Sequence, residues 1–250
     1  MCIRDRDITV KPVNKRTRKR LPFPLSIYQT AVGKKWVMAL TGIGLMGFVF
    51  FHMFGNLKMY LGPEEFDAYA AGLREILVPI LPHGAFLWIM RAGLLTIFVL
   101  HLHAAYSLTI MNRRARGPKP GASKRDYIAA NFASLTMRYS GILLLAFILM
   151  HLANLTFGVS ALDTRFASEQ VYSNVWTSLN QPWLAALYII GNLALGVHLF
   201  HGAWSMFQSL GVNNPRYNAL RKYFAVGFTA VVIGANISFP IAVLAGVVGP

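Results

Sequence analysis

Histidine is the residue type whose placement in this sequence most strongly indicates chemistry. Six of the seven histidines lie inside long apolar stretches: His52, His101, His103, His151, His198 and His201. The seventh, His83, lies between two turn-forming residues at the edge of such a stretch, where we expect an interfacial position. An ionisable side chain inside a membrane span is costly and is a functional-site hypothesis by default. Imidazole can ligate a haem iron, or it can hydrogen-bond a neighbouring helix.

The histidines fall at two depths, measured from the helix ends that the positive charge places inside. At about 1.5 Å of rise per residue, His52 and His151 lie roughly 24 Å along their helices, near the outer leaflet. His103 and His198 lie roughly 13 to 18 Å from the inner ends of theirs. Two pairs of imidazoles at two depths, each pair drawn from two helices, are what two bis-histidine haems need in a four-helix bundle.

The second apolar stretch contains two candidate histidines. Residues two apart in a helix point about 200° from each other, so His101 and His103 cannot bind the same iron. Glycines lie ten residues before three histidines: Gly42 before His52, Gly93 before His103 and Gly141 before His151. This spacing favours His103, and it would give each of these helices a surface without side chains beside the haem at the other depth. Close packing of helices through small residues explains the same glycines equally well.

The elements that must position these residues are membrane helices. The chain has 250 residues, a mean hydropathy of +0.47 and only 13% charged residues, which is too apolar for a soluble domain. Five apolar spans are expected, at residues 36–57, 86–111, 132–157, 182–210 and 223–248, each long enough to cross about 30 Å of hydrocarbon. The predicted fold is an all-α integral membrane protein whose first four helices form a haem-binding bundle.

The positive charges predict the orientation and the domain boundaries. Lys and Arg number ten before the first span, six in residues 112–126 and three in residues 211–222, against three in the other two connections. This bias places the N-terminus in the cytoplasm. It also explains the net charge of +15 without nucleic acid, which we do not expect as a partner. Residues 1–24 are predicted to be a basic cytoplasmic tail, and residues 25–250 the membrane domain. A short helix is expected to start at Pro63 in the outer connection.

The remaining polar residues narrow the possible functions. Arg91 and Arg138 lie just inside the second and third spans and could pair with haem propionates or extend to the headgroups. The spans contain no Asp or Glu, which argues against an ion-coupled transporter. The single cysteine, Cys2, excludes an intrachain disulfide and an iron–sulfur centre held by this chain alone.

Several motifs resemble the succinate dehydrogenase and fumarate reductase cytochrome b558 family. They are GKKWVMALTGIGLMGFVFFHMFGNLKMY at residues 33–60, HAAY at 103–106, MH at 150–151 and HLFHGAWSMFQSLGV at 198–212. The resemblance extends from about Gly33 to Val248. It implies a five-helix, dihaem membrane anchor that carries electrons between a quinone and the flavoprotein and iron–sulfur subunits of the same complex.

The resemblance also implies the ligands. The axial histidines match His52, His103, His151 and His198, with His198 preferred to His201 because Trp204 follows it by six residues. The implied pairs are His103 with His198 near the cytoplasm, and His52 with His151 on the outer side. An acidic residue near the outer haem serves quinone chemistry in the family, and the local candidates are Glu64, Glu65 and Glu75. Menaquinone is the usual quinone of family members with two haems, so the resemblance implies menaquinone here.

The preferred hypothesis is the cytochrome b subunit of a succinate:quinone oxidoreductase in the bacterial cytoplasmic membrane, with the dicarboxylate site on a partner subunit. The main alternative is quinol:fumarate reductase, which runs the same fold in the reverse direction. The cytochrome of a quinol:cytochrome c complex fits less well, because that type has two ligands on each of two helices. A transporter or a purely structural anchor without haem is a further alternative.

Overall fold

The computed structural model describes residues 21–115, 128–159, 161–162, 165–212 and 214–249. Most of the predicted basic tail, with Cys2, and most of the basic connection at residues 112–126 lie outside these residues. The described chain is helical, with these elements in order: α1 (Leu25–Tyr28), α2 (Ala31–Asn56), the 3-10 helix η1 (Leu57–Leu61), α3 (Pro63–Glu75), α4 (Ala85–Ala115), α5 (Ile128–Leu155), α6 (Val171–Leu179), α7 (Pro182–Ser209), the 3-10 helix η2 (Pro215–Tyr217) and α8 (Asn218–Leu244).

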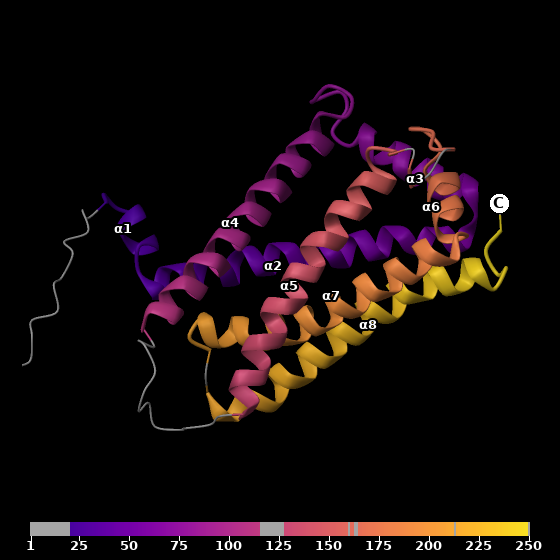
Figure 1. Ribbon diagram of the computed structural model, residues 1–250. Helices are drawn as coiled ribbons and strands as arrows, with labels where there is room; N and C mark the ends of the chain where they lie inside the picture. The colour runs from indigo at the N-terminus through magenta and orange to yellow at the C-terminus, as the bar shows by residue number, and fades with distance from the viewer. Residues whose placement is uncertain (1–20, 116–127, 160, 163–164, 213, 250) are drawn as a thin grey trace, which may run out of the picture.

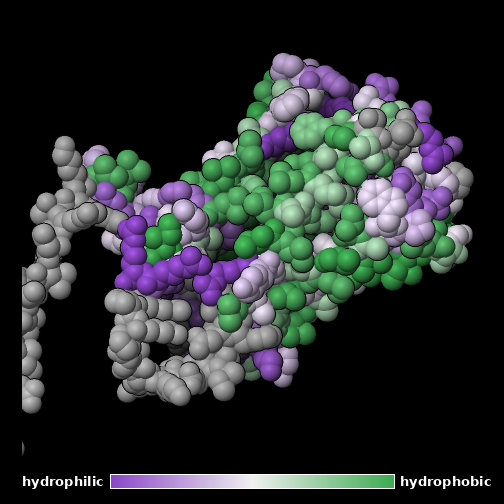
Figure 2. Space-filling view, in the orientation of Figure 1, coloured by the Kyte–Doolittle hydropathy of each residue, from purple (hydrophilic) through white to green (hydrophobic). Residues whose placement is uncertain are grey.

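Five of these helices, α2, α4, α5, α7 and α8, are long and apolar enough to cross a membrane. The predicted five-span fold is thus confirmed, and so is the short helix that starts at Pro63. Large apolar side chains are exposed along the spans, among them Trp88, Ile142 and Tyr223. Figure 2 shows that apolar residues cover the middle of the molecule while hydrophilic residues gather toward its ends. Such a surface is stable in hydrocarbon, so the chain is a multi-pass membrane protein.

The spans are arranged around α7, which packs against α2, α5 and α8, and α2 packs in turn against α4 (Figure 1). Small buried residues on α7 allow this close packing, including Ala185, Ala194 and Ala203. The four helices α4, α2, α7 and α5 therefore form the bundle that carries the candidate histidines. The eighth helix, α8, closes the far side of α7, where Val232 is fully buried against Met53 and Leu199.

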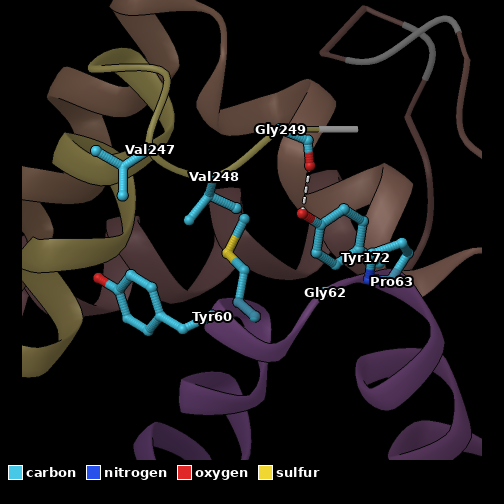
Figure 3. A pocket seen from close by; sticks show the side chains of 8 residues that line it. Tyr60, Gly62, Pro63, Tyr172, Val247, Val248 and Gly249 are labelled. Carbon is cyan, nitrogen blue, oxygen red and sulfur yellow. Dashed lines mark hydrogen bonds between the residues drawn. The ribbon is translucent and has the colours of Figure 1, made fainter.

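The outer end of the bundle is capped by α3, α6 and the segment after α8. The carboxylate of Asp67 on α3 accepts a hydrogen bond from the backbone N–H of Tyr172, in the first turn of α6 (2.9 Å). Tyr172 donates its hydroxyl proton to the carbonyl of Gly249, and burial raises the pKa of this phenol, so it stays a neutral donor. The Trp176 Nε1–H donates to the carbonyl of Val248 at 3.2 Å. Figure 3 shows Tyr172 pointing at Gly249. Both residues line a cavity of about 210 Å³.

The inner end is held by α1 and by the connection between α7 and α8. Thr30 caps α2, because its hydroxyl accepts the N–H of Gly33 at 2.9 Å. Arg221 on α8 is only 3% exposed and donates to the carbonyl of Val212 at 2.7 Å, while its guanidinium lies over the ring of Trp204. These contacts hold the start of α2 and the α7–α8 connection at the end where the sequence places the cytoplasm.

Removing the Asp67 carboxylate should loosen the outer cap. We expect Asp67→Ala to lower the stability of the protein in detergent by about 0.5–2 kcal/mol, because an N–H in the first turn of α6 loses its acceptor. Thermal unfolding measures the change. Glu64→Ala is the matched control, since Glu64 lies on the same helix, is exposed and makes no hydrogen bond or ion pair in the described part of the chain. Equal stability of the two variants would contradict the capping role.

Candidate cofactor site

The outer histidines face each other between α2 and α5. The ring centroids of His52 and His151 are 5.9 Å apart, and the planes cross at 84°. Phe48 stacks on His52, with ring centroids 5.3 Å apart, and Phe147 lies beside His151 at 6.0 Å. The two imidazoles that the sequence paired at the outer depth are therefore neighbours, and aromatic rings flank both.

A buried polar network continues from His151 to the outer cap. The hydroxyl of Tyr188 lies 3.4 Å from Nδ1 of His151 and accepts from the side-chain amide of Asn154 at 3.2 Å. Asn154 accepts in turn from the hydroxyl of Ser178 on α6, at 3.1 Å. Asn154 and Ser178 are fully buried, so these bonds satisfy polar groups that hydrocarbon could not. The network fixes the position of His151 relative to α6 and α7.

The inner pair consists of His101 on α4 and His198 on α7. Their ring centroids are 6.4 Å apart and the planes cross at 65°. Nδ1 of His101 lies 3.1 Å from the hydroxyl of Thr41, and Nδ1 of His198 lies 3.3 Å from the hydroxyl of Ser140. The glycine that follows each hydroxyl residue is close to the same ring. A Cβ at Gly42 or at Gly141 would lie 3.5 Å from Cε1 of His101 or His198, respectively.

His103 lies elsewhere, in contrast to the pairing expected from the sequence. Its Nδ1 is 2.6 Å from the hydroxyl of Tyr28 in α1, and His103 is exposed. Burial raises the pKa of Tyr28, so this phenol keeps its proton at neutral pH and can donate it to His103. The inward face of α4 contains His101, Ala104 and Leu108, a spacing of three and four residues on one helix face. A residue two positions after His101 cannot share that face.

The other candidate residues from the sequence lie outside both pairs. Among the described residues, nothing outside its own helix comes within 4 Å of a Cβ built at Gly93. The guanidinium of Arg91 lies over the ring of Trp88 at 4.9 Å, and Arg138 is half-buried on α5. His201 lies against the ring of Phe200. The three acidic candidates are on α3: Glu64 is exposed, Glu65 pairs with Lys58 at 3.8 Å, and Glu75 pairs with His83 at 3.0 Å.

The geometry of the two pairs can be tested against a haem iron. Two iron–imidazole bonds of about 2 Å each place the ring centroids roughly 6 Å apart, close to the observed 5.9 and 6.4 Å. Within the described residues, no group of three or more His, Cys, Asp or Glu side chains could hold a metal ion by itself. Isolated pairs of imidazoles suit an iron whose other four ligands come from a porphyrin. The residues present therefore fit haem.

Sequence reasoning missed the hydroxyl partners of the inner pair. Thr41 and Ser140 each lie directly before a glycine and eleven residues before an outer histidine, so the pattern hydroxyl–Gly–x9–His occurs twice. Gly93, the third glycine of the ten-residue spacing, follows an alanine. The repeated hydroxyl was the available signal that separated Gly42 and Gly141 from Gly93.

Comparison with known protein families gives an independent assignment. Residues 111–236, about half of the chain, match the model of the succinate dehydrogenase/fumarate reductase transmembrane subunit family. The chain belongs to this family. A search of curated proteins found no match, and a search of solved structures found none either. Membership of the succinate dehydrogenase/fumarate reductase family makes the chain a membrane subunit of that type of complex, and the matched region contains His151 and His198.

Because His101 and His103 lie on different faces of α4, replacing each in turn tests which of them is the inner ligand. We expect His101→Ala to remove one of two haems from the purified protein, because no other imidazole on α4 faces His198. The pyridine haemochrome measures haem per chain. His103→Ala is the matched control and should keep both haems, since His103 contacts Tyr28 instead. Loss of a haem in His103→Ala, with both retained in His101→Ala, would return the assignment to His103.

Proposed function

We propose that this chain is the cytochrome b anchor of a succinate:quinone oxidoreductase. It passes electrons from an iron–sulfur partner subunit, through two b-type haems, to a quinone. His101 and His198 are the proposed ligands of the inner haem, and His52 and His151 those of the outer haem. This assignment keeps three of the four ligands expected from the sequence and replaces His103 with His101.

The observation that carries the proposal is the presence of two facing imidazole pairs at two levels of one bundle. Thr41, at the inner level, precedes His52, at the outer level, by eleven residues on α2, which corresponds to roughly 16 Å of helix. A structural anchor without haem has no need for four imidazoles inside the hydrocarbon, where each is costly. The absence of carboxylates inside the described spans argues further against a transporter.

The side chains of the bundle hold and insulate the proposed ligands. A porphyrin iron with two imidazole ligands supplies one-electron oxidation and reduction without a change of ligands. Hydroxyl groups hold the inner imidazoles through Nδ1, which leaves Nε2 of each ring for ligation. Phe48 stacks on His52 and Phe147 lies beside His151, and the surrounding spans are apolar.

The partner subunits are proposed to dock at the inner end, which is the cytoplasmic end by charge. Positive residues there include Arg113 and Arg114 at the end of α4, and Arg216 and Lys222 around the start of α8. The flavoprotein carries the dicarboxylate site in this arrangement, and the iron–sulfur subunit lies between it and the inner haem. Quinone, for which menaquinone is the proposed species, reacts at the outer level. The membrane is the bacterial cytoplasmic membrane.

A reduced-minus-oxidised spectrum of the purified protein tests the proposed function. We expect a b-type α-band and two haems per chain. His52→Ala should leave one haem, because the outer iron loses a ligand while the inner pair lies about three helical turns away. Haem content and the split of the α-band measure the outcome.

The matched control is His83→Ala. His83 pairs with the exposed Glu75 outside the bundle, so its replacement should leave both haems in place. Wild-type protein that folds in the membrane without haem would overturn the cytochrome function and favour a structural anchor. Retention of two haems in His52→Ala would overturn the outer ligand pair alone.

A further inference from the structure

Two hydroxyl side chains occupy equivalent positions on α2 and α5. Thr41 lies beside His101 of the adjacent helix α4, and Ser140 lies beside His198 of the adjacent helix α7. Thr41 is 7% exposed and Ser140 is also 7% exposed, so neither hydroxyl is a surface group. Both contacts join a hydroxyl to Nδ1, and both histidines belong to the same facing pair.

The proton of each hydroxyl is already engaged with its own helix. Thr41 donates to the carbonyl of Val37 at 2.6 Å, and Ser140 donates to the carbonyl of Met137 at 3.2 Å. A hydroxyl has one proton and two lone pairs, so each of these groups can accept from the imidazole while it donates to its own helix. Ligation of the proposed haem iron through Nε2 requires the imidazole proton on Nδ1, which then donates it to the hydroxyl.

The two halves of the bundle repeat this device. In each half, a helix carries a hydroxyl, a glycine and, eleven residues after the hydroxyl, an outer histidine; the neighbouring helix carries the inner histidine. Gly42 and Gly141 leave the space next to the imidazole that a larger side chain would enter. The same hydroxyl–imidazole contact occurs between α2 and α4 and again between α5 and α7, so chance is a poor explanation for it.

We propose that Thr41 and Ser140 are positioning residues that fix the tautomer and ring orientation of His101 and His198, and so tune the redox potential of the inner haem alone. The inference rests on the proposed function, since it requires haem between these two imidazoles. A hydrogen bond that Nδ1–H donates makes the imidazole a more basic ligand. A more basic ligand stabilises the oxidised iron, so the hydroxyls lower the midpoint potential of the inner haem.

The test is a redox titration of full-length protein carrying Thr41→Val, Ser140→Ala or both. The inner haem is identified as the one that His101→Ala removes. We expect its midpoint potential to shift upward in each single variant and further in the double variant, with the outer haem unchanged. The principal g-values of the low-spin ferric inner haem should shift as well, because the imidazole planes are no longer held.

Three matched variants separate this role from helix packing. Thr109→Val removes the same type of hydroxyl-to-carbonyl bond on α4, to Ala105, and Ser205→Ala removes the corresponding bond on α7, to Gly202; neither has a described contact with a histidine. Both should leave the inner potential unchanged. Thr41→Ser keeps the hydroxyl and should behave as wild type, including where Thr41→Val weakens haem retention.

The possible results separate the positioning role of Thr41 and Ser140 from the proposed cytochrome function. Two haems with unshifted potentials in the double variant, or shifts no larger than in Thr109→Val and Ser205→Ala, would overturn the positioning role while leaving the cytochrome function intact. Equal loss of the inner haem in Thr41→Ser and Thr41→Val would overturn it too. Wild-type protein without haem would remove both.

Discussion

The structure depends on the need to satisfy both nitrogens of an imidazole inside hydrocarbon. Water cannot do so there, and each unsatisfied polar group is costly. Nδ1 of His101 and of His198 has a hydroxyl partner in Thr41 and in Ser140, respectively. Nδ1 of His151 lies near the hydroxyl of Tyr188. Each of these rings lies opposite a second imidazole across the bundle, with ring centroids 6.4 Å apart at the inner level and 5.9 Å apart at the outer level. The packing of α2, α4, α5 and α7 can be understood as the arrangement that meets this requirement at two levels.

Helix α7 makes the arrangement rigid because it touches α2, α5 and α8 at once. It supplies His198 to the inner level and Tyr188 to the outer one, ten residues apart on the same helix. Gly191 lies between them, and a Cβ there would come within 2.3 Å of Phe147. This close approach of α5 and α7 brings Phe147 against His151. A single helix therefore sets the geometry of both pairs, and the hydrogen-bonded outer cap secures its outer end through Ser178 and Asn154.

The five spans could be predicted because length and hydropathy are local properties of the sequence. The first span starts five residues before its predicted start, since Thr30 provides the cap that begins α2. The last span ends at Leu244 rather than at residue 248, because Gly246 adopts a positive φ of 71° and turns the chain back onto α6. The pairing of His52 with His151 followed from depth alone. The choice between His101 and His103 did not, because it depends on which face of α4 meets α2, and the glycine spacing favoured the residue that contacts Tyr28. Ala104 and Leu108 lie three and seven residues after His101, and this spacing puts all three on the face of α4 that is buried.

The segment after α8 gives the protein an order of assembly. Val248 and Gly249 are bound by Trp176 and Tyr172 of α6, which precedes the last two spans in the chain. During synthesis, α6 reaches the outer side while its acceptors are still untranslated, and they arrive there only after α8 has crossed the membrane. The completed cap joins the segments that follow the first, third and fifth spans, so it requires these three segments on one side of the membrane. A folding intermediate that lacks the last crossing leaves two aromatic donors of α6 without their acceptors.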